Sequence, residues 1–155
     1  MSSAEDRILC RLKGISSSEL SKVNKDNVAL EQFRCIVLDA VKSTGKYHSY
    51  LAGVLGISEA AISRLDAVTC RTRAYNFAHA VKFTLLAADT YEEALRLMAL
   101  SGNALKVTLP YEQQLAFYLM QNIYSEGCTG WESRIVMAVS IIDKLPELHE
   151  LNSSD

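Results

Sequence analysis

Residues 48–67, HSYLAGVLGISEAAISRLDA, decide the fold that we expect for this chain. Two helical patterns, residues 49–55 and 58–68, are separated only by Gly56 and Ile57, so the backbone must turn sharply between them. Gly56 can adopt a positive φ without steric cost. Ser58 can accept a hydrogen bond from the amides that open the second helix. The stretch therefore predicts two helices joined by a tight turn.

The side chains around this turn suit two helices that cross closely. Ala52, four residues before the glycine, leaves room for the second helix. The apolar contacts that hold the two helices at a fixed angle are expected from Leu51, Leu55, Ile57, Ile62 and Leu65. This is the layout of a helix-turn-helix, whose second helix can project into a DNA major groove about 12 Å wide.

Helical periodicity continues on both sides of the turn. Apolar residues recur every three or four positions, which places them on one face of a helix, in residues 31–42, 73–87, 90–101, 110–124 and 131–145. Thr90 and Glu93 form a capping box, Gly102 is typical of a helix stop, and Pro110 suits a helix start. The patterns at residues 7–12 and from residues 16–18 onward predict short helices. No convincing strand pattern occurs, and only residues 105–109 come near the alternation of a strand. We therefore expect an all-α, compact bundle of roughly six to eight helices that contains a helix-turn-helix.

The composition describes a chain that must pack. Its 155 residues suit one domain, and 49% hydrophobic with 22% charged residues excludes a disordered tail or a low-complexity linker. Its apolar runs are far shorter than the roughly 20 residues of a spanning helix, and its start lacks the order of a signal peptide. We expect a cytoplasmic protein without a membrane partner. Its expected parts are an N-terminal extension (1–30), a helix-turn-helix core (31–88) and a C-terminal helical region continuous with that core (89–155).

The net charge of −2 is unevenly distributed. Residues 1–88 carry 12 Lys and Arg against 8 Asp and Glu, a net charge of +4, whereas residues 89–155 carry 4 against 10, a net charge of −6. The first region attracts phosphates and the second repels them. Small asymmetries of this kind are common, so the distribution supports a nucleic-acid partner without establishing one.

Recognisable patterns of catalytic or metal-binding residues are missing from the sequence. Four cysteines, at positions 10, 35, 70 and 128, occur without a C-x-x-C pair or a nearby histidine, which excludes a zinc knuckle and predicts small buried thiols. No phosphate-binding, dinucleotide-binding, zinc-protease or hydrolase motif occurs. We expect no enzyme, no catalytic or metal-binding residues and no cofactor. His79 and Trp131 are expected to be packing residues.

Ala52, Gly56 and Ile62, with the apolar residues around them, resemble the helix-turn-helix of the Xre/Cro-like regulators of bacteria and their phages. A longer likeness follows in residues 81–105, where many Xre-like proteins have a capped EEA-x-x-L helix and a closing G-x-A-L. The matching residues here are Glu92, Glu93, Ala94, Leu97, Gly102, Ala104 and Leu105. The resemblance covers residues 31–124. It implies a helical bundle and a transcriptional regulator that binds DNA sequence-specifically through a recognition helix at about residues 58–67.

The resemblance assigns base reading to the exposed positions of the recognition helix, namely Ser58, Glu59, Ala60, Ser63 and Arg64. Arg64 can pair bidentately with guanine, Glu59 can accept from a cytosine amine, and Ala60 can contact a thymine methyl group. His48 occupies the place where the family often has a glutamine near a phosphate. Contacts to the DNA backbone are expected from Lys46, His48, Arg71 and Arg73. One short helix with one arginine makes few contacts, so we expect a homodimer paired through the C-terminal helices.

The sequence also departs from the family. Ala67 and Val68 stand where members usually have Asn-Gly, and Thr72 stands near the usual proline. Glu59 and Asp66 offset the single arginine, and Asp66 could form a surface ion pair with Arg64 or Arg71. These features leave a second interpretation open, a protein-interaction module such as an adaptor or antitoxin-like partner that keeps the fold without reading DNA.

Overall fold

The computed structural model describes residues 28–66, 73–106, 108–127 and 130–142 of the chain. These residues form seven α-helices and one short 3-10 helix, and none of them lies in a β-strand. The expected all-α bundle of six to eight helices is confirmed. No helix in these ranges is long and apolar enough to cross a membrane. Several predictions fall outside the described residues: the short helices before residue 28, the exit turn at Ala67, Val68 and Thr72, the phosphate candidate Arg71, and Cys10, Cys70 and Cys128.

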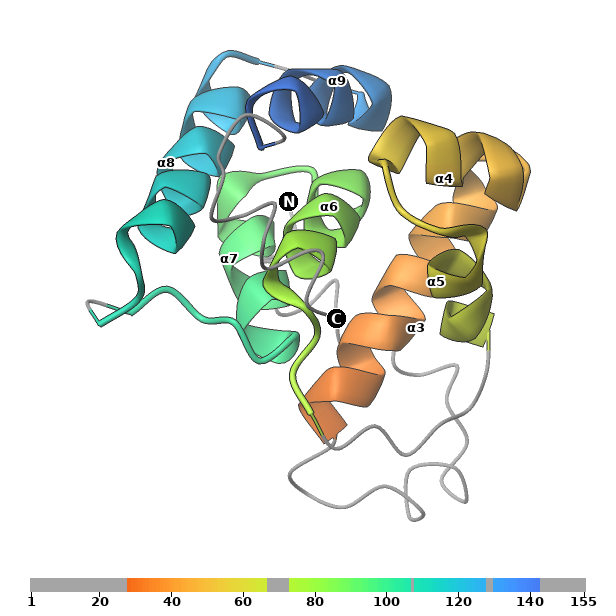
Figure 1. Cartoon of the computed structure of the whole chain (residues 1–155), viewed down its shortest axis with the longest axis horizontal. Helices are drawn as coiled ribbons and strands as arrows, with labels where there is room; N and C mark the ends of the chain where they lie inside the picture. The colour runs from red at the N-terminus through yellow and green to blue at the C-terminus, as the bar shows by residue number, and fades with distance from the viewer. Residues whose placement is uncertain (1–27, 67–72, 107, 128–129, 143–155) are drawn as a thin grey trace.

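Helix α6 lies at the centre of the bundle. In chain order the elements are α3 (Val28–Ser43), α4 (His48–Leu55), α5 (Glu59–Ser63), the 3-10 helix η2 (Arg64–Asp66), α6 (Phe77–Ala87), α7 (Tyr91–Leu100), α8 (Tyr111–Ser125) and α9 (Trp131–Ile142). Helices α3, α7, α8 and α9 all pack on α6, and every residue of α6 except His79 is buried. Helices α4 and α5 lie together at one side of the molecule, beyond α3 (Figure 1).

One hydrophobic cluster runs through the whole described bundle. Its members include Phe33 of α3, Leu55 of α4, Ile62 of α5, Phe117 of α8 and Ile135 of α9, each at most 2% exposed. These side chains are apolar residues at helical spacing, which brings them to one face of each helix. The helices before and after residue 88 therefore share one core.

Three buried basic side chains each bond to a backbone carbonyl group at the end of a helix. The bonds run from Arg34 Nη1 to Leu65 O in η2, from Lys82 Nζ to Gly56 O at the end of α4 (3.3 Å), and from Arg134 Nε to Leu85 O in the last turn of α6 (2.7 Å). The last carbonyl groups of a helix lack an intrahelical donor and carry partial negative charge. Each of these donors therefore supplies a partner to a carbonyl group at a helix end, and two of the three acceptor residues, Leu65 and Leu85, are buried.

Helix α6 begins at Phe77, so the predicted start of this helix at residue 73 is wrong. The Asn76 side chain accepts a hydrogen bond from His79 N at 3.2 Å and caps the helix one residue earlier. The backbone of Tyr75 is bonded to the end of α7 instead, because Tyr75 N donates to Ser101 O at 2.9 Å and Asn103 Nδ2 donates to Tyr75 O at 2.9 Å. Residues 73–76 therefore form a connecting strap and not a helical turn.

The recognition-helix segment is shorter than its sequence pattern predicts. Residues 58–68 predict one continuous helix, but the α-helical part of α5 ends at Ser63 and the next turn tightens into η2. The bond from Arg34 to Leu65 O lies in that tighter turn. Short 3-10 turns of this kind are common at the ends of α-helices.

Both ends of α7 follow the prediction with one difference. Thr90 Oγ1 accepts from Glu93 N at 3.2 Å, which confirms the cap, but the Glu93 carboxylate accepts from the amide of Asp89 at 3.0 Å and not from that of Thr90. At the other end Gly102 has a φ of +90°, and Asn103 N donates to Met98 O at 2.9 Å. Helix α7 therefore stops at Gly102 and Asn103, as predicted.

Candidate functional site

The turn between α4 and α5 has the backbone geometry that its sequence predicts. Gly56 is left-handed, with a φ of +68°, and Ile57 N donates to Ala52 O at 3.0 Å, which closes the end of α4. The Ser58 hydroxyl accepts from Ala61 N at 3.2 Å and caps α5. The chain thus passes from α4 to α5 through Gly56, Ile57 and Ser58 alone.

Helices α4 and α5, with the turn between them, form what we call the α4–α5 unit. The inner side of this unit packs against the rest of the bundle. Ala52 is 5% exposed and Ile62 is fully buried, so both residues occupy the structural positions that we expect of them. The leucines predicted to hold the two helices, Leu51, Leu55 and Leu65, are buried as well, and Ile57 is partly buried. Packing on one side leaves the other side of α5 facing solvent.

All five candidates for base reading lie on that outer side and are exposed, namely Ser58, Glu59, Ala60, Ser63 and Arg64. Arg64 Nε donates to Ala60 O at 3.2 Å, within its own helix. Within the described ranges Arg64 forms no ion pair, so the alternative pairing with Asp66 does not occur there. The structure brings these five residues together on one open surface.

Two of the phosphate candidates, Lys46 and His48, lie at the start of α4 beside this surface. His48 Nδ1 is 3.4 Å from the Ser63 hydroxyl, which links the first turn of α4 to the end of α5. The ammonium group of Lys46 lies over the ring of Tyr50, 5.3 Å from the ring centroid. Both basic side chains are exposed, so this edge of the unit can meet an anion without rearrangement of the core.

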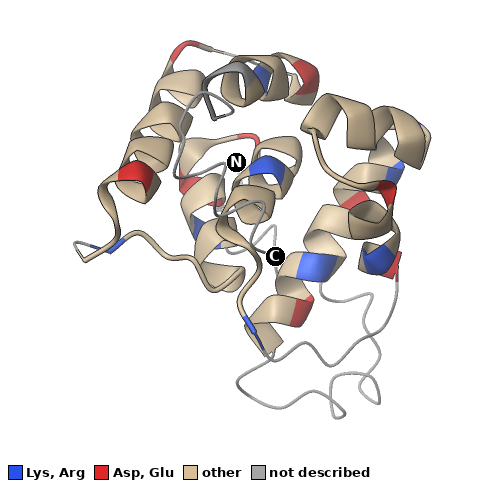
Figure 2. Ribbon diagram, viewed as in Figure 1, with Lys and Arg blue, Asp and Glu red and all other residues tan. Residues whose placement is uncertain are grey.

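Tyr47 and Tyr50 are candidate residues that the sequence patterns do not identify. Tyr47 is 84% exposed and Tyr50 is 44% exposed, and they flank His48. A signal for this edge does exist in the sequence, because residues 40–58 contain Lys42, Lys46 and His48 but no Asp or Glu. Acidic positions outnumber basic ones on the side formed by α7, α8 and α9 (Figure 2). Among the described residues, the start of α4 therefore forms a basic edge beside α5.

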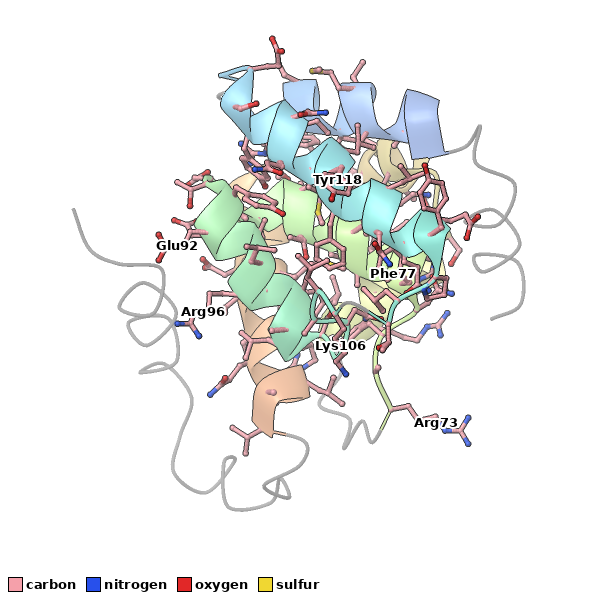
Figure 3. All side chains as sticks on the ribbon, turned by 90° about the vertical axis from the view of Figure 1, so that its left-hand side faces the viewer. Arg73, Phe77, Glu92, Arg96, Lys106 and Tyr118 are labelled. Carbon is pink, nitrogen blue, oxygen red and sulfur yellow. The ribbon has the colours of Figure 1, made fainter. Side chains whose placement is uncertain are left out.

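The remaining described phosphate candidate, Arg73, is not part of this surface. Ala74, the next residue, lies close to Gly102 at the end of α7, and the strap 73–76 lies on the other side of α3 from α5 (Figure 1). Arg73 itself projects away from the bundle at this end (Figure 3). The structure thus joins Lys46, His48 and the α5 residues, and it separates Arg73 from them.

The other residues considered from the sequence have packing roles. His79 is half-buried and makes a T-shaped contact with Phe83, with 6.2 Å between the ring centroids, and Trp131 packs partly buried against the core. Cys35 on α3 is a half-buried thiol whose Sγ donates to Glu31 Oε1 at 3.7 Å. Among the described residues, no group of three or more His, Cys, Asp and Glu side chains could hold a metal ion.

Compared with protein-family models, with curated proteins and with solved structures, the chain matches none of them.

Proposed function

We propose that the chain is a sequence-specific DNA-binding transcriptional regulator of the Xre/Cro-like type, with α4 and α5 as its DNA-binding unit. The observation that carries the proposal is the open outer side of α5 beside the start of α4, where Lys46 and His48 are exposed. Specific binding to DNA needs both parts, because cations bind the phosphates and an exposed helix reads the base edges.

The candidate base contacts are the five exposed residues 58, 59, 60, 63 and 64. Arg64 uses only its Nε in an intramolecular bond within the described ranges, which leaves both terminal amino groups for a bidentate contact to guanine. Glu59 offers an acceptor for a cytosine amine, and Ala60 offers a methyl group for thymine. The buried side chains of Ile62 and Leu65 hold these residues outward.

The candidate phosphate contacts are Lys46, His48 and the first amides of α4. Tyr47 stands at the N-cap of α4 and makes no side-chain cap hydrogen bond, so the first-turn amides have no side-chain acceptor from that position. Amides at a helix N-terminus suit a phosphate, and the Lys46 ammonium group adds a positive charge beside them. Exposed Tyr47 can donate its hydroxyl to a phosphate oxygen.

A homodimer would give this small surface the number of contacts that specific binding requires. Support for a pairing surface comes from α8, where residues 113–125 carry no charged side chain. Tyr111 and Tyr118, seven residues apart and so on one face of this helix, are 68% and 63% exposed. The measurement is the molar mass by analytical ultracentrifugation, with Tyr118→Glu expected to shift a dimer to a monomer.

The proposal is tested by fluorescence anisotropy on duplex DNA from upstream of the chain's own gene. We expect a Kd below about 1 μM at low salt, and an affinity that falls steeply between about 50 and 200 mM salt. Lys46→Ala should weaken binding to all sequences and lower the salt slope by about one. Lys106→Ala is the matched control, because Lys106 is an exposed lysine on another side of the bundle (Figure 3). No binding below micromolar concentrations at low salt would contradict the proposal.

A second candidate function, a protein-interaction module, is favoured by the exposed apolar side chains of the last two helices. Val136 is 66% exposed on α9, in addition to the two tyrosines of α8. Apolar residues that remain exposed in this way often mark contacts with another protein. If the chain is a protein-interaction module, the anisotropy titration shows no binding to DNA. Substitutions at Tyr118 then weaken a complex with a protein partner.

A further inference from the structure

Helix α5 is too short for its own backbone hydrogen bonds to fix its orientation. It has five residues before the backbone tightens into η2, and isolated helices below about 12 residues are marginal in water. Its main packing partner is α4, which is itself an eight-residue helix, while η2 packs on α3. Contacts from outside the α4–α5 unit must therefore fix the tilt of α5 relative to the bundle.

One such contact comes from Lys82 of the central helix α6. Its side chain is 1% exposed, and its Nζ donates to the carbonyl oxygen of Gly56 at 3.3 Å, at the turn that leads into α5. Lysine is almost never fully buried unless its nitrogen has partners. Lys82 lies in a helix whose other residues are mostly apolar, so packing alone does not explain a lysine at this position.

The second contact comes from Arg34 of α3, at the other end of the segment. Arg34 is 8% exposed, and its Nη1 donates to the carbonyl oxygen of Leu65 in η2. The carboxylate of Glu31 binds the same guanidinium group, with Arg34 Nε to Glu31 Oε2 at 2.9 Å. The guanidinium group is therefore oriented from α3 while it bonds to the last turn of the recognition segment.

We infer that Lys82 and Arg34 are positioning residues that fix the tilt of α5 by bonding to the backbone carbonyl groups of Gly56, which precedes it, and Leu65, which follows it. Part of this inference rests on the proposed function, because the tilt decides which base edges Arg64 and Ser63 can reach. A recognition site must be held within about 0.5 Å and 10–20° of its productive geometry. The backbone contacts themselves do not depend on DNA, so they can be tested without it.

The first experiment measures amide hydrogen exchange in the full-length chain. In Lys82→Met, which keeps an unbranched side chain of similar length, protection of the amides in residues 57–66 should fall by about tenfold, the effect of one lost hydrogen bond, while protection in α6 and α8 stays unchanged. Lys42→Met, at an exposed lysine of α3, is the matched control. Equal loss of protection in all segments, or no loss in residues 57–66, would overturn the inference.

Arg34→Lys is the second variant, chosen to keep a cation beside buried Glu31. Lysine can pair with Glu31 but lacks the second arm that reaches Leu65 O. We expect the same local loss of protection in residues 57–66, with the midpoint of thermal unfolding changed little. If Lys82→Met fails to fold, Arg34→Lys tests the inference instead. The inference is then overturned if Arg34→Lys loses protection equally in all segments or loses none in residues 57–66.

The DNA arm compares a preferred duplex with a scrambled one. Both variants should lose about tenfold in the ratio of the two affinities, with the affinity for scrambled DNA within about twofold of the original protein. A parallel loss on both duplexes would show that the two residues do not set specificity. Failure of the original protein to bind DNA would overturn the proposed function, and hydrogen exchange would then still decide whether these residues fix α5.

Discussion

The guanidinium group of Arg134 lies over the ring of Tyr124, 5.5 Å from the ring centroid, and the two side chains bond to neighbouring carbonyl groups at the end of α6. Arg134 Nε donates to Leu85 O at 2.7 Å, and Tyr124 Oη donates to Ala88 O at 2.9 Å. Arg134 comes from α9 and Tyr124 from α8. Helices α8 and α9 thus contact the end of α6 through hydrogen bonds as well as through apolar packing.

We predict that Arg134→Met lowers the free energy of unfolding by about 3 kcal/mol, because the carbonyl groups of Leu85 and Leu86 stay buried and lose a charged donor. Urea denaturation measures this change. Arg96→Met, at an exposed arginine of α7, is the control and should change stability by less than about 0.5 kcal/mol. Equal effects of the two substitutions would contradict the structural role of Arg134.

The partly buried hydroxyl group of Tyr124 predicts a loss of stability at alkaline pH. Burial raises the pKa of Tyr124 well above its usual range, and the positive charge of Arg134 only partly offsets this effect. The folded pKa is higher than the unfolded one, so the stabilisation is complete below about pH 10 and is lost as the pH rises from there toward the folded pKa.

Urea denaturation at about pH 8 and about pH 11 tests whether the free energy of unfolding falls as the pH rises. The original chain should lose more stability over this interval than Tyr124→Phe, which has no hydroxyl group to ionise at this position. Tyr91, whose pKa burial also raises, acts in the same direction in both proteins and cancels in the comparison. The same alkaline loss in both proteins would contradict the prediction.

Gly53 inside α4 and Gly56 just after it offer a matched pair of substitutions with opposite expected signs. Gly56→Ala should destabilise the fold by about 1–2 kcal/mol, because alanine is strained at a φ of +68°. A Cβ atom at Gly56 would meet Lys82 Nζ at 3.5 Å, an ordinary contact, so backbone strain and not a clash causes the loss. Gly53→Ala, inside the helix with open space around it, should stabilise the fold by about 0.5–1 kcal/mol. Thermal unfolding of both variants gives the signs.

If the proposed function is right, Arg64→Ala should relax base preference. We expect binding to the preferred duplex to weaken by about 1–3 kcal/mol, while binding to a scrambled duplex changes far less, because a lost base contact matters only where the base is present. Anisotropy titrations on both duplexes measure the difference. Arg96→Ala removes the same charge from α7, on another side of the molecule, and should leave the ratio of affinities unchanged (Figure 3).

The sequence alone predicted those features that depend on neighbours along the chain. The left-handed Gly56, the Ser58 cap and the Thr90 cap each involve groups within five residues, so a short pattern contains all the information that they need. Helical spacing also predicted which residues of α4 and α5 are buried and which are exposed. The all-α fold follows from the same periodicity.

The tertiary structure alone decided the features whose partners lie far apart in the sequence. Helix α6 starts late because Tyr75 bonds to Ser101 and Asn103, which lie more than twenty residues away. Lys82 and Arg134 stand in helices whose apolar patterns give no reason for a buried cation, and their carbonyl partners lie 26 and 49 residues distant. A periodic pattern predicts which face of a helix is buried. It does not predict which neighbouring helix ends against that face, because the packing of the helices decides this.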